Sequence, residues 1–396
     1  MSENQNAQNA SGWTGGQYSL FRALLAVQTA CVLGARLLQS AADRPWLAGV
    51  LLLGLLACLP LAFGARDRFA TIFLILAVGG GAALADGVPL LLPTVEVVVT
   101  TILLGLHLFV PPAPFGSRDA ADRVDPSGEW KRPAWLGHSA WGLVAAAHFL
   151  RAAAGIEPNS FLQETMGLSI PGLTLAVMVF QGGLFLIGLI PRLRPAAWVA
   201  LVLFRIACLT AFGTLPGDGS LLLLLLFACE PIWFRGRALH LLDGAATKGQ
   251  SEPASNGPAR LYYDGDCGFC HGSIRFILSE EDATPNALRL RFAPLASEGF
   301  ADRIATEAGL RASEIPDSIV LDLEDGRLLT QSAAALEIAS RLGGIWLGIA
   351  LIARPIPSSI LDLAYDAFAR IRKRLFAAPK GACPILPPMM RVRFDL

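Results

Sequence analysis

Two cysteines, Cys267 and Cys270, lie three positions apart in the segment Leu261-Tyr-Tyr-Asp-Gly-Asp-Cys-Gly-Phe-Cys270. The segment begins with an apolar and aromatic run, breaks at Asp-Gly, and is followed by apolar residues at helical spacing. This pattern predicts a strand, a tight turn and a dithiol at the start of a helix. Because the first helical turn has unpaired backbone N–H groups, it would favour Cys267 as the thiolate that attacks disulfides.

The residues around the dithiol leave two points to weigh. Zinc sites also use a Cys-x-x-Cys pair, but they require two further ligands, and the only other cysteine outside the apolar half is Cys383. His271 is adjacent to Cys270, which is an awkward position for a ligand of the same metal. We therefore favour a redox dithiol and expect no bound metal.

Asp264 and Asp266 oppose the effect of the helix start on Cys267, because nearby carboxylates disfavour a thiolate.

The composition is too apolar for an ordinary soluble protein. Of 396 residues, 54% are hydrophobic and only 16% are charged, and the mean hydropathy is +0.52. We expect a membrane protein with a soluble part. The 32 basic and 32 acidic side chains cancel, so the overall charge gives no indication of a nucleic-acid partner. Residues 1–17 form a polar tail without a basic segment, so we expect no cleaved leader.

Residues 18–237 are expected to form a membrane domain of about eight transmembrane helices. A membrane-spanning helix needs about 17–25 mostly apolar residues. The runs that meet or approach this requirement are Tyr18–Leu38, Trp46–Gly64, Phe69–Ala85, Leu90–Val110, Trp135–Ala154, Leu173–Ile190, Ala196–Leu215 and Ser220–Trp233. The last run is short, and only a brief turn separates the third from the fourth, so these runs could be re-entrant.

The loops between these runs carry most of their positive charge on one side. Ten basic residues lie after the second, fourth, sixth and eighth runs: Arg66, Arg68, Arg118, Arg123, Lys131, Arg132, Arg192, Arg194, Arg235 and Arg237. The opposite loops contain Arg36, Arg44 and Arg151. Because Lys and Arg concentrate in cytoplasmic loops, we predict a multi-pass protein of the inner (cytoplasmic) membrane with its C-terminal domain in the cytoplasm.

Polar side chains at membrane depth are costly and are therefore candidate functional residues. Glu96 and His107 are eleven residues apart, about three helical turns, and share one face of the fourth run. Arg205 lies in the middle of the seventh run and requires a partner, which Glu96 or Glu230 could provide. Two interpretations stay open for this polar cluster: ion pairs that fix helix packing, or a polar cavity for a quinone or a lipid headgroup.

The segment Phe180-Gln-Gly-Gly-Leu-Phe-Leu-Ile-Gly-Leu-Ile-Pro-Arg-Leu-Arg-Pro195 and the opening Tyr18-Ser-Leu-Phe-Arg22 resemble the HTTM family, which is related to vitamin K-dependent carboxylase. The resemblance implies a compact bundle of helices over residues 18–237. The carboxylase branch of that family relies on a membrane-embedded Lys, whereas these runs contain none, and Arg205 stands where many relatives have His. Carboxylase chemistry is therefore not expected here.

A linker rich in Gly, Ser, Ala and Pro, residues 238–259, leads to a soluble domain at 260–396. Its expected elements alternate as in an α/β thioredoxin-like fold. The strands are Arg260–Tyr263, Leu288–Ala293, Ser318–Asp322 and Arg327–Leu329, and the helices are Gly272–Ser279, Ser297–Ala308 and Ser332–Leu342. The expected fold class is thus an α-helical membrane bundle joined to a thioredoxin-like domain.

Tyr263-Asp-Gly-Asp-Cys-Gly-Phe-Cys270 resembles the Asp-Cys-Cys (DCC) family of thiol-disulfide oxidoreductases. The further motifs that carry the resemblance are Ser332-Ala-Ala-Ala-Leu-Glu-Ile338, Gly343-Gly-Ile-Trp346, Ile356-Pro357, Asp362, Tyr365, Ala369-Arg-Ile-Arg372 and Cys383-Pro384. The resemblance implies that Cys267 attacks, that Cys270 resolves and that Asp264 completes the motif. It also implies a cis-proline at Pro316 against the dithiol, with Asp266 and Cys383 as supporting residues. Ile371 and Leu361 depart from the pattern of the family.

Several roles remain open on the sequence. Asp264 could equally be a turn residue whose carboxylate binds the following N–H groups. The basic segment 370–374 could dock on an anionic membrane surface or on the membrane half, or it could be a solvated helix face. The first functional hypothesis is a membrane-anchored thiol-disulfide oxidoreductase whose dithiol exchanges electrons with a protein thiol or disulfide partner or with the membrane half. The alternatives are an HTTM-like transporter or lipid-handling protein with a regulatory redox domain, and an enzyme that passes electrons from the dithiol to a quinone.

Overall fold

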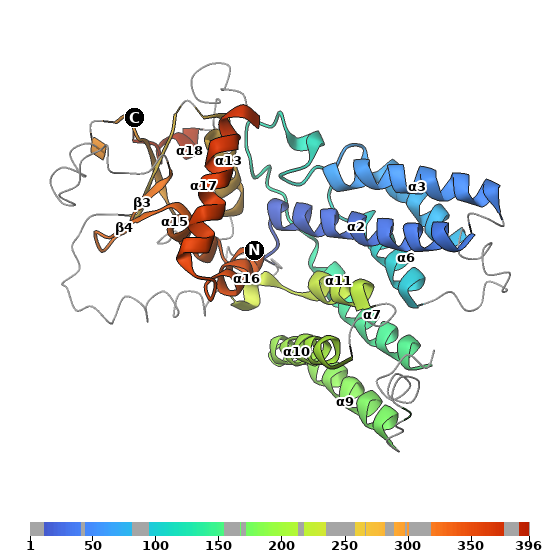
Figure 1. Cartoon of the computed structure of the whole chain (residues 1–396). Coiled ribbons are helices and arrows are strands. Elements are labelled where there is room, and N and C mark those ends of the chain that lie inside the picture. Colours follow the sequence, from blue (N-terminus) through green and yellow to red (C-terminus); the bar gives the residue numbers. More distant parts are fainter. Residues whose placement is uncertain are drawn as a thin grey trace, which may run out of the picture. The chain divides into compact units, whose positions relative to one another are not determined.

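The structure is a computed structural model that describes residues 12–40, 44–80, 95–153, 167, 172–212, 218–234, 258–265, 267–281, 289–297, 299–300, 318–375 and 388–395 (Figure 1). By their contacts these residues form two units. The helical unit comprises Tyr18–Asp119 and Lys131–Glu230, and the dithiol unit comprises Gly12–Gln17, Ala120–Trp130 and the chain from Pro231 onward. The described chain is mostly helical, with a small mixed sheet in its C-terminal region.

Each of the eight apolar runs contains a helix. The elements are α2 (Gly15–Ser40), α3 (Pro45–Phe63), α4 (Asp67–Ile75) with the π-helix η1 (Leu76–Gly80), α6 (Val95–His107), α7 (Ala134–Ala153), α9 (Leu173–Gly188), α10 (Arg194–Phe212) and α11 (Asp218–Ala228). Among the residues described, three helices are long and apolar enough to cross a membrane, over Gly15–Gln39, Pro45–Phe63 and Arg194–Ala211. These helices fit a membrane protein. Since α6, α9 and α11 are shorter, the number of spans stays a prediction.

Helix α3 shows why these segments fit an apolar environment. Pro45 occupies the first turn, where a missing N–H costs nothing, and Gly64 ends the helix with a φ of 63°. Leu47 and Leu51 are buried, whereas Leu52 and Leu56 on the other side are exposed. A helix that is apolar on every side loses stability if its outer face meets water, so the outer face of α3 requires an apolar partner such as lipid.

Helix packing in the helical unit brings buried charges together. Helix α4 packs on α3 and α6, and α7 packs on α9 and α11. Arg22 on α2 lies 3.5 Å from the carboxylate of Asp67, and His107 lies 3.4 Å from the same carboxylate. The hydroxyl of Tyr18 lies 2.6 Å from His107 Nδ1. Asp67 on α4 therefore contacts both Arg22 on α2 and His107 on α6, and these buried contacts constrain how the three helices pack.

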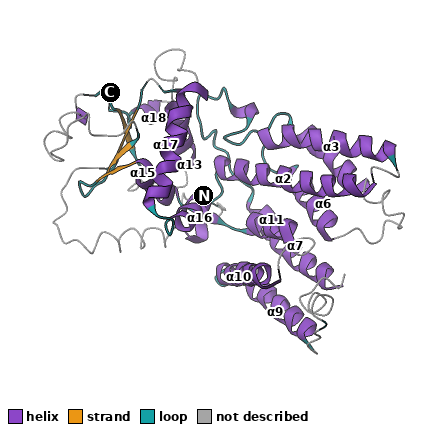
Figure 2. Ribbon diagram, in the orientation of Figure 1, coloured by secondary structure: helices purple, strands orange, loops and turns teal. Residues whose placement is uncertain are grey.

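The sheet of the dithiol unit, whose strands are orange in Figure 2, has the strand order β2-β1-β3-β4. The strands are β1 (Arg260–Tyr263), β2 (Arg291–Pro294), β3 (Val320–Asp322) and β4 (Leu328–Thr330). Strands β1 and β2 are parallel, and the other two pairs are antiparallel. The helices are α13 (Gly268–Glu280), α15 (Gln331–Leu342), α16 (Gly344–Ala353), α17 (Ser358–Leu375) and α18 (Pro388–Arg391), and α16 and α17 meet at 118°.

The boundaries of several elements differ from the sequence prediction; β3, for example, begins at Val320 instead of Ser318. Strand β1 has the predicted bounds, and α15 ends before Gly343, which has the positive φ expected of a helix stop. Helix α15 begins at Gln331, one residue before the predicted Ser332, and Thr330 is its N-cap. Helix α13 starts at Gly268 rather than at the predicted Gly272, because the dithiol itself forms its first turn. The predicted helix Ser297–Ala308 lies mostly outside the described residues.

The two faces of the sheet are covered differently because successive residues of β1 point to opposite sides. Leu261 faces Phe292 on β2 and Leu321 on β3, and these side chains pack with α13 and α15 in the larger core. Tyr262 points the other way and packs on Phe300 in a smaller cluster. The larger core therefore anchors α13, the helix that carries the dithiol.

A buried carboxylate at the far end of α13 binds the segment Gly12–Gln17. Glu280 accepts hydrogen bonds from the hydroxyl of Thr14, from the backbone N–H of Gly16 at 2.8 Å and from Trp346 Nε1 at 2.6 Å. Burial raises the pKa of Glu280, and these donors counteract part of that rise. The end of the predicted polar tail is therefore a structural part of the dithiol unit.

Candidate active site

Cys267 is the N-cap of α13. Its backbone is extended, with φ −98° and ψ 113°, and its Sγ accepts a hydrogen bond from the backbone N–H of Cys270 at 3.3 Å. The sequence predicted the sulfur within the first turn; it lies one position earlier, where a side chain can accept from the orphan N–H groups of the helix. The sulfur of Cys267 thus has a backbone N–H donor of the helix start within hydrogen-bonding distance.

Cys270 is more enclosed than its partner and is held as a thiol. Its exposed fraction is 2%, against 4% for Cys267. Burial, followed by the hydrogen bond and the charge of Cys267, raises the pKa of Cys270 to about 12. The guanidinium of Arg372 lowers that pKa in part. At neutral pH the side chain of Cys270 is therefore protonated.

Two side chains of α17 complete the surroundings of Cys270. Arg372 Nη1 lies 3.8 Å from Cys270 Sγ, and the exposed fraction of Arg372 is 2%. Tyr365 accepts a hydrogen bond from the backbone N–H of Ile319 at 3.2 Å, and burial raises the pKa of its phenol. The interpretation of segment 370–374 as a surface patch is therefore wrong for Arg372. The spacing of Tyr365, Phe368 and Arg372, which repeats over two helical turns, is a signal that could have indicated their shared inward face.

A cavity of about 260 Å³ opens beside Cys270. Its walls are mainly apolar, with Ser273, Tyr365 and Arg372 as polar members. The other lining residues are Leu261, Tyr263, Phe269, Cys270, Ile274, Phe276, Ile277, Ile319, Ala335, Ile338, Ala339, Leu342, Trp346 and Phe368. Cys270 is thus the cysteine that borders the cavity.

The predicted supporting residues divide into those that the structure describes and those that it does not. The carbonyl oxygen of Asp264 accepts a hydrogen bond from the backbone N–H of Cys267 at 3.4 Å, so the backbone of Asp264 takes part in the turn. His271 donates from Nε2 to the carbonyl oxygen of Gly265 at 2.7 Å, which ties the helix to the turn. The predicted roles of Asp266, Pro316 and Cys383 concern positions outside the described residues.

The four residues of the predicted membrane polar cluster have separate partners in the helical unit. Glu96 accepts from Gln28 at 3.5 Å, His107 lies beside Asp67, and Glu230 lies 3.9 Å from Arg194. They therefore contribute to several helix contacts.

Arg205 pairs with a residue outside the predicted cluster. It lies 4.0 Å from Asp218, which also accepts from Arg151 at 2.8 Å, whereas Glu96 or Glu230 was expected. Sequence reasoning missed Asp218 because it assigned this residue to the loop before the last apolar run.

No three His, Cys, Asp or Glu side chains are close enough to hold a metal ion within the part of the chain that the structure describes. The polar side chains that line the cavity beside Cys270 are a guanidinium, a phenol and the hydroxyl of Ser273.

Residues 261–378 match the family described as DCC1-like thiol-disulfide oxidoreductase. The uncharacterized protein YuxK of Bacillus subtilis (strain 168) is 31% identical over 134 residues, which is 34% of this chain and 91% of YuxK. No solved structure matches the chain. Through this C-terminal region the chain belongs to the DCC1-like thiol-disulfide oxidoreductase family.

Proposed function

We propose that the protein is a membrane-anchored thiol-disulfide oxidoreductase in which Cys267 attacks and Cys270 resolves. The observation that carries this assignment is the difference between the two sulfurs. Cys267 Sγ caps a helix and accepts the N–H of Cys270, whereas burial keeps Cys270 as a thiol. An attacking group must be available as a thiolate, and a resolving group must stay protonated until the mixed disulfide has formed.

The exchange proceeds in two balanced steps. The thiolate of Cys267 attacks one sulfur of a substrate disulfide, forms a mixed disulfide and releases the other sulfur as a thiolate, which takes up a proton. Cys270 then loses its proton and attacks Cys267 Sγ, which releases the second substrate thiol and closes the Cys267–Cys270 disulfide. The substrate gains the two electrons that the dithiol loses. The reverse sequence oxidises two substrate thiols.

Arg372 assists the second step in this proposal. Its guanidinium lies 3.8 Å from Cys270 Sγ, so it stabilises the thiolate that Cys270 must become in order to resolve the mixed disulfide. Since Cys270 rests as a neutral thiol, this stabilisation acts mainly during the reaction. The apolar cavity beside Cys270 suits an apolar side chain next to the substrate cysteine, which favours a protein thiol or disulfide as the partner.

The topology supports a thioredoxin-like domain. A strand, the dithiol helix and a parallel strand are followed by an antiparallel pair and a helix, in the sheet order β2-β1-β3-β4. A Cys-x-x-Cys pair at the end of the first strand of such a unit is typical of thioredoxin-like redox motifs.

We further propose that the helical unit anchors this domain at the inner membrane, in a multi-pass arrangement with the dithiol in the cytoplasm. The three long apolar helices and the excess of basic residues in one set of loops support this topology. A cytoplasmic location would keep the dithiol mostly reduced at rest.

The test uses the purified full chain and a small aliphatic disulfide, 2-hydroxyethyl disulfide. Because Cys31 is exposed and Cys383 is a further thiol, both are replaced by Ser in every sample. With Cys270→Ser, mass spectrometry should find a mixed disulfide at Cys267. With both cysteines present, the end product should be the Cys267–Cys270 disulfide. With Cys267→Ser, Cys270 should stay unmodified.

Two outcomes would count against the proposal. If Cys270 in the Cys267→Ser variant reacted as fast as Cys267 in the Cys270→Ser variant, the roles of the two sulfurs would be wrong. If neither variant formed a mixed disulfide and the parent chain formed no internal disulfide, the oxidoreductase function itself would be refuted. A matched Cys208→Ser variant, which removes a buried thiol from α10, should behave like the parent chain.

The second candidate function is an HTTM-like transporter or lipid-handling protein with a regulatory redox domain. The buried group formed by Arg151, Asp218 and Arg205 favours it, because intramembrane charges are candidate functional sites. In that case Arg205→Ala would abolish the transport or lipid handling by the chain in cells, and Cys267→Ser would leave that activity intact. The first proposal predicts that Cys267→Ser abolishes the cellular function.

A further inference from the structure

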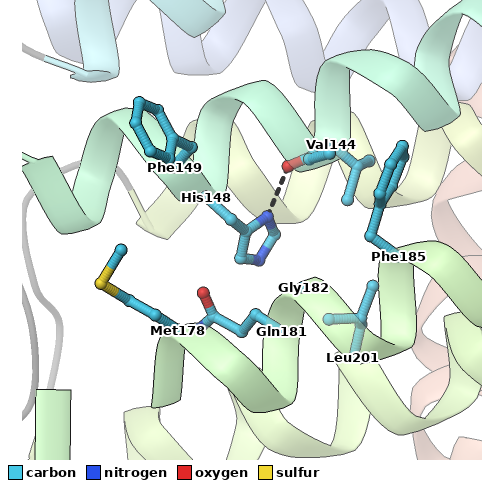
Figure 3. Close-up of a pocket in the computed structure, with 9 residues that line it drawn as sticks. Val144, His148, Phe149, Met178, Gln181, Gly182, Phe185 and Leu201 are labelled. Atoms are coloured by element: carbon cyan, nitrogen blue, oxygen red, sulfur yellow. Dashed lines mark hydrogen bonds between the residues drawn. The ribbon is translucent and has the colours of Figure 1, made fainter. Parts of the chain in front are cut away.

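The helical unit contains a cavity of about 220 Å³ between α7, α9 and α10 (Figure 3). Most of its wall is apolar, with Phe149 on α7, Met178 and Phe185 on α9 and Leu201 on α10. Two polar side chains, His148 and Gln181, face each other across this space (Figure 3). An apolar cavity with a few polar groups is the usual form of a small-molecule site.

Both ring nitrogens of His148 are already used. Nδ1 lies 2.6 Å from the carbonyl oxygen of Val144, and because a carbonyl can only accept, Nδ1 carries the hydrogen. Nε2 is then the acceptor of the hydrogen bond that Arg205 Nε donates at 3.4 Å. The ring is therefore neutral and fixed in one tautomer, and it forms a rigid wall of the cavity.

Gln181 lacks a partner at the same place. Its exposed fraction is 5%, and its Nε2 has no hydrogen-bond partner among the residues that the structure describes. Figure 3 shows the amide of Gln181 between Met178 and the ring of His148. A buried N–H group without an acceptor is costly, so this amide requires an acceptor from outside the described chain. The missing group is a hydrogen-bond acceptor that fits inside an apolar cavity.

The surroundings of the cavity favour a lipophilic ligand. The outer faces of α7 and α9 expose Phe149, Leu175 and other large apolar side chains, so a ligand would enter from an apolar phase.

We propose that this cavity binds a neutral lipophilic molecule whose carbonyl oxygen accepts a hydrogen bond from Gln181 Nε2. A quinone and an ester lipid both present this chemistry to the site. The proposal concerns the helical unit alone and does not depend on the reaction of the dithiol.

The experiment uses the full chain in nanodiscs of a dialkyl ether phosphatidylcholine, which supplies no ester carbonyl. A radiolabelled decylbenzoquinone is the probe, and dioleoylglycerol is the competitor, with the corresponding dialkyl ether glycerol as the competitor that lacks a carbonyl. Saturable binding of the quinone is expected. Displacement by dioleoylglycerol identifies a general carbonyl site, and no displacement identifies a quinone site; the ether glycerol should not displace the probe in either case.

Two variants and one control test the position of the site. Gln181→Leu removes the donor and should weaken binding about tenfold, the effect of one hydrogen bond in an apolar site. Gly182→Leu should fill the cavity, because a Cβ at Gly182 meets no neighbouring atom within 4 Å. Leu186→Gln places an amide on the exposed face of the same helix and should leave binding unchanged.

The proposal is overturned if neither the quinone nor dioleoylglycerol binds saturably. It is equally overturned if Gln181→Leu and Gly182→Leu, with helicity and elution volume like those of the parent chain, bind both molecules as the parent does. The pair of variants protects the test against a folding defect in one of them, since the two substitutions act by different means.

Discussion

In the helical unit the carboxylate of Asp218 lies within 4.0 Å of the guanidinium groups of Arg151 and Arg205, whereas in the dithiol unit Arg372 lies 3.8 Å from the thiol of Cys270. All of these side chains are buried. Removing one member of a buried group of opposite charges destabilises the resting fold, because the remaining charge stays buried without compensation. A charge beside a neutral but ionisable sulfur contributes most when the sulfur loses its proton. Similar buried arginines therefore serve packing in one unit and, in our proposal, reaction in the other.

The largest expected effect comes from removing the shared carboxylate of the helical unit. Asp218→Asn leaves two buried guanidinium groups with less compensation and should cost about 3–5 kcal/mol of stability. Thermal unfolding of the full chain in detergent, followed by circular dichroism, measures the loss. Asp122→Asn, an equal change of charge at an exposed position, should change stability by less than about 0.5 kcal/mol. An equally small effect at Asp218 would break the contrast between the units.

The second prediction concerns the effect of Arg372 on the rate at which the mixed disulfide is resolved. Arg372→Met should raise the pH at which Cys270 ionises by about one pKa unit and lengthen the life of the mixed disulfide about tenfold. Arg372→Lys keeps a positive charge and should recover most of the rate. The measurement is the decay of the mixed disulfide against pH after stoichiometric reaction with 2-hydroxyethyl disulfide.

The control for Arg372 is Arg370→Met, which removes an exposed charge from the same helix. It should leave the decay unchanged. If Arg372→Met shifted thermal stability but not the pH profile of the decay, Arg372 would be a packing residue like the arginines of the helical unit.

The third prediction concerns the buried carboxyl of Glu280, which binds Thr14. Thr14→Val removes one donor and should cost about 1–3 kcal/mol, because Glu280 stays buried with one hydrogen bond fewer. Faster proteolysis near residue 17 at equal protease concentration would report the loss. Thr210→Val, which changes an exposed threonine on α10, is the matched control.

Glu280 should also make stability depend on pH. Burial raises its pKa above the ordinary value of 4.5, so the folded chain binds this proton more tightly than the unfolded chain. The stabilisation is complete below pH 4.5 and is lost as the pH rises through the folded pKa. The difference in stability between the parent chain and Glu280→Gln should therefore shift in favour of the parent as the pH is lowered. A difference that is independent of pH would contradict the raised pKa.

The smallest effect is expected at the exposed pair of Asp325 and Arg327, which lie 2.6 Å apart at the turn before β4. Arg327→Ala should change stability by less than about 1 kcal/mol, because water and salt screen an exposed ion pair. Chemical denaturation at low and high salt measures it. If Arg327→Ala lowered the stability as much as Asp218→Asn does, burial would not determine how much an ion pair contributes to the stability of this chain.

The parts of the fold with a local pattern could be predicted from the sequence. The apolar and aromatic run of β1 and the apolar runs of the helical unit fall where they were expected. The start of α13 was placed four residues late, because a capping cysteine has no signature that apolar periodicity detects. The position of the dithiol Cys267 and Cys270 at the start of a helix could be predicted from the sequence pattern alone.

Contacts between distant residues could not be predicted in this way. Asp218 was set aside as a loop residue, and Arg372 was grouped in one basic segment with Arg370, which is exposed. The segments Gly12–Gln17 and Ala120–Trp130, which belong to the dithiol unit, carry no periodic pattern that links them to it. Each of these features depends on a partner that is far away along the chain, and a local pattern carries no information about it.

The bond between Thr14 and Glu280 has a consequence for biosynthesis, since the two residues are 266 positions apart. At roughly 5–20 residues per second, the ribosome needs about 13–53 s to reach Glu280 after it has made Thr14. The buried hydroxyl of Thr14 and the N–H of Gly16 are without this acceptor throughout that interval. Completion of the first turn of α2 is therefore a late event in the life of the nascent chain, although its residues are among the first to be made.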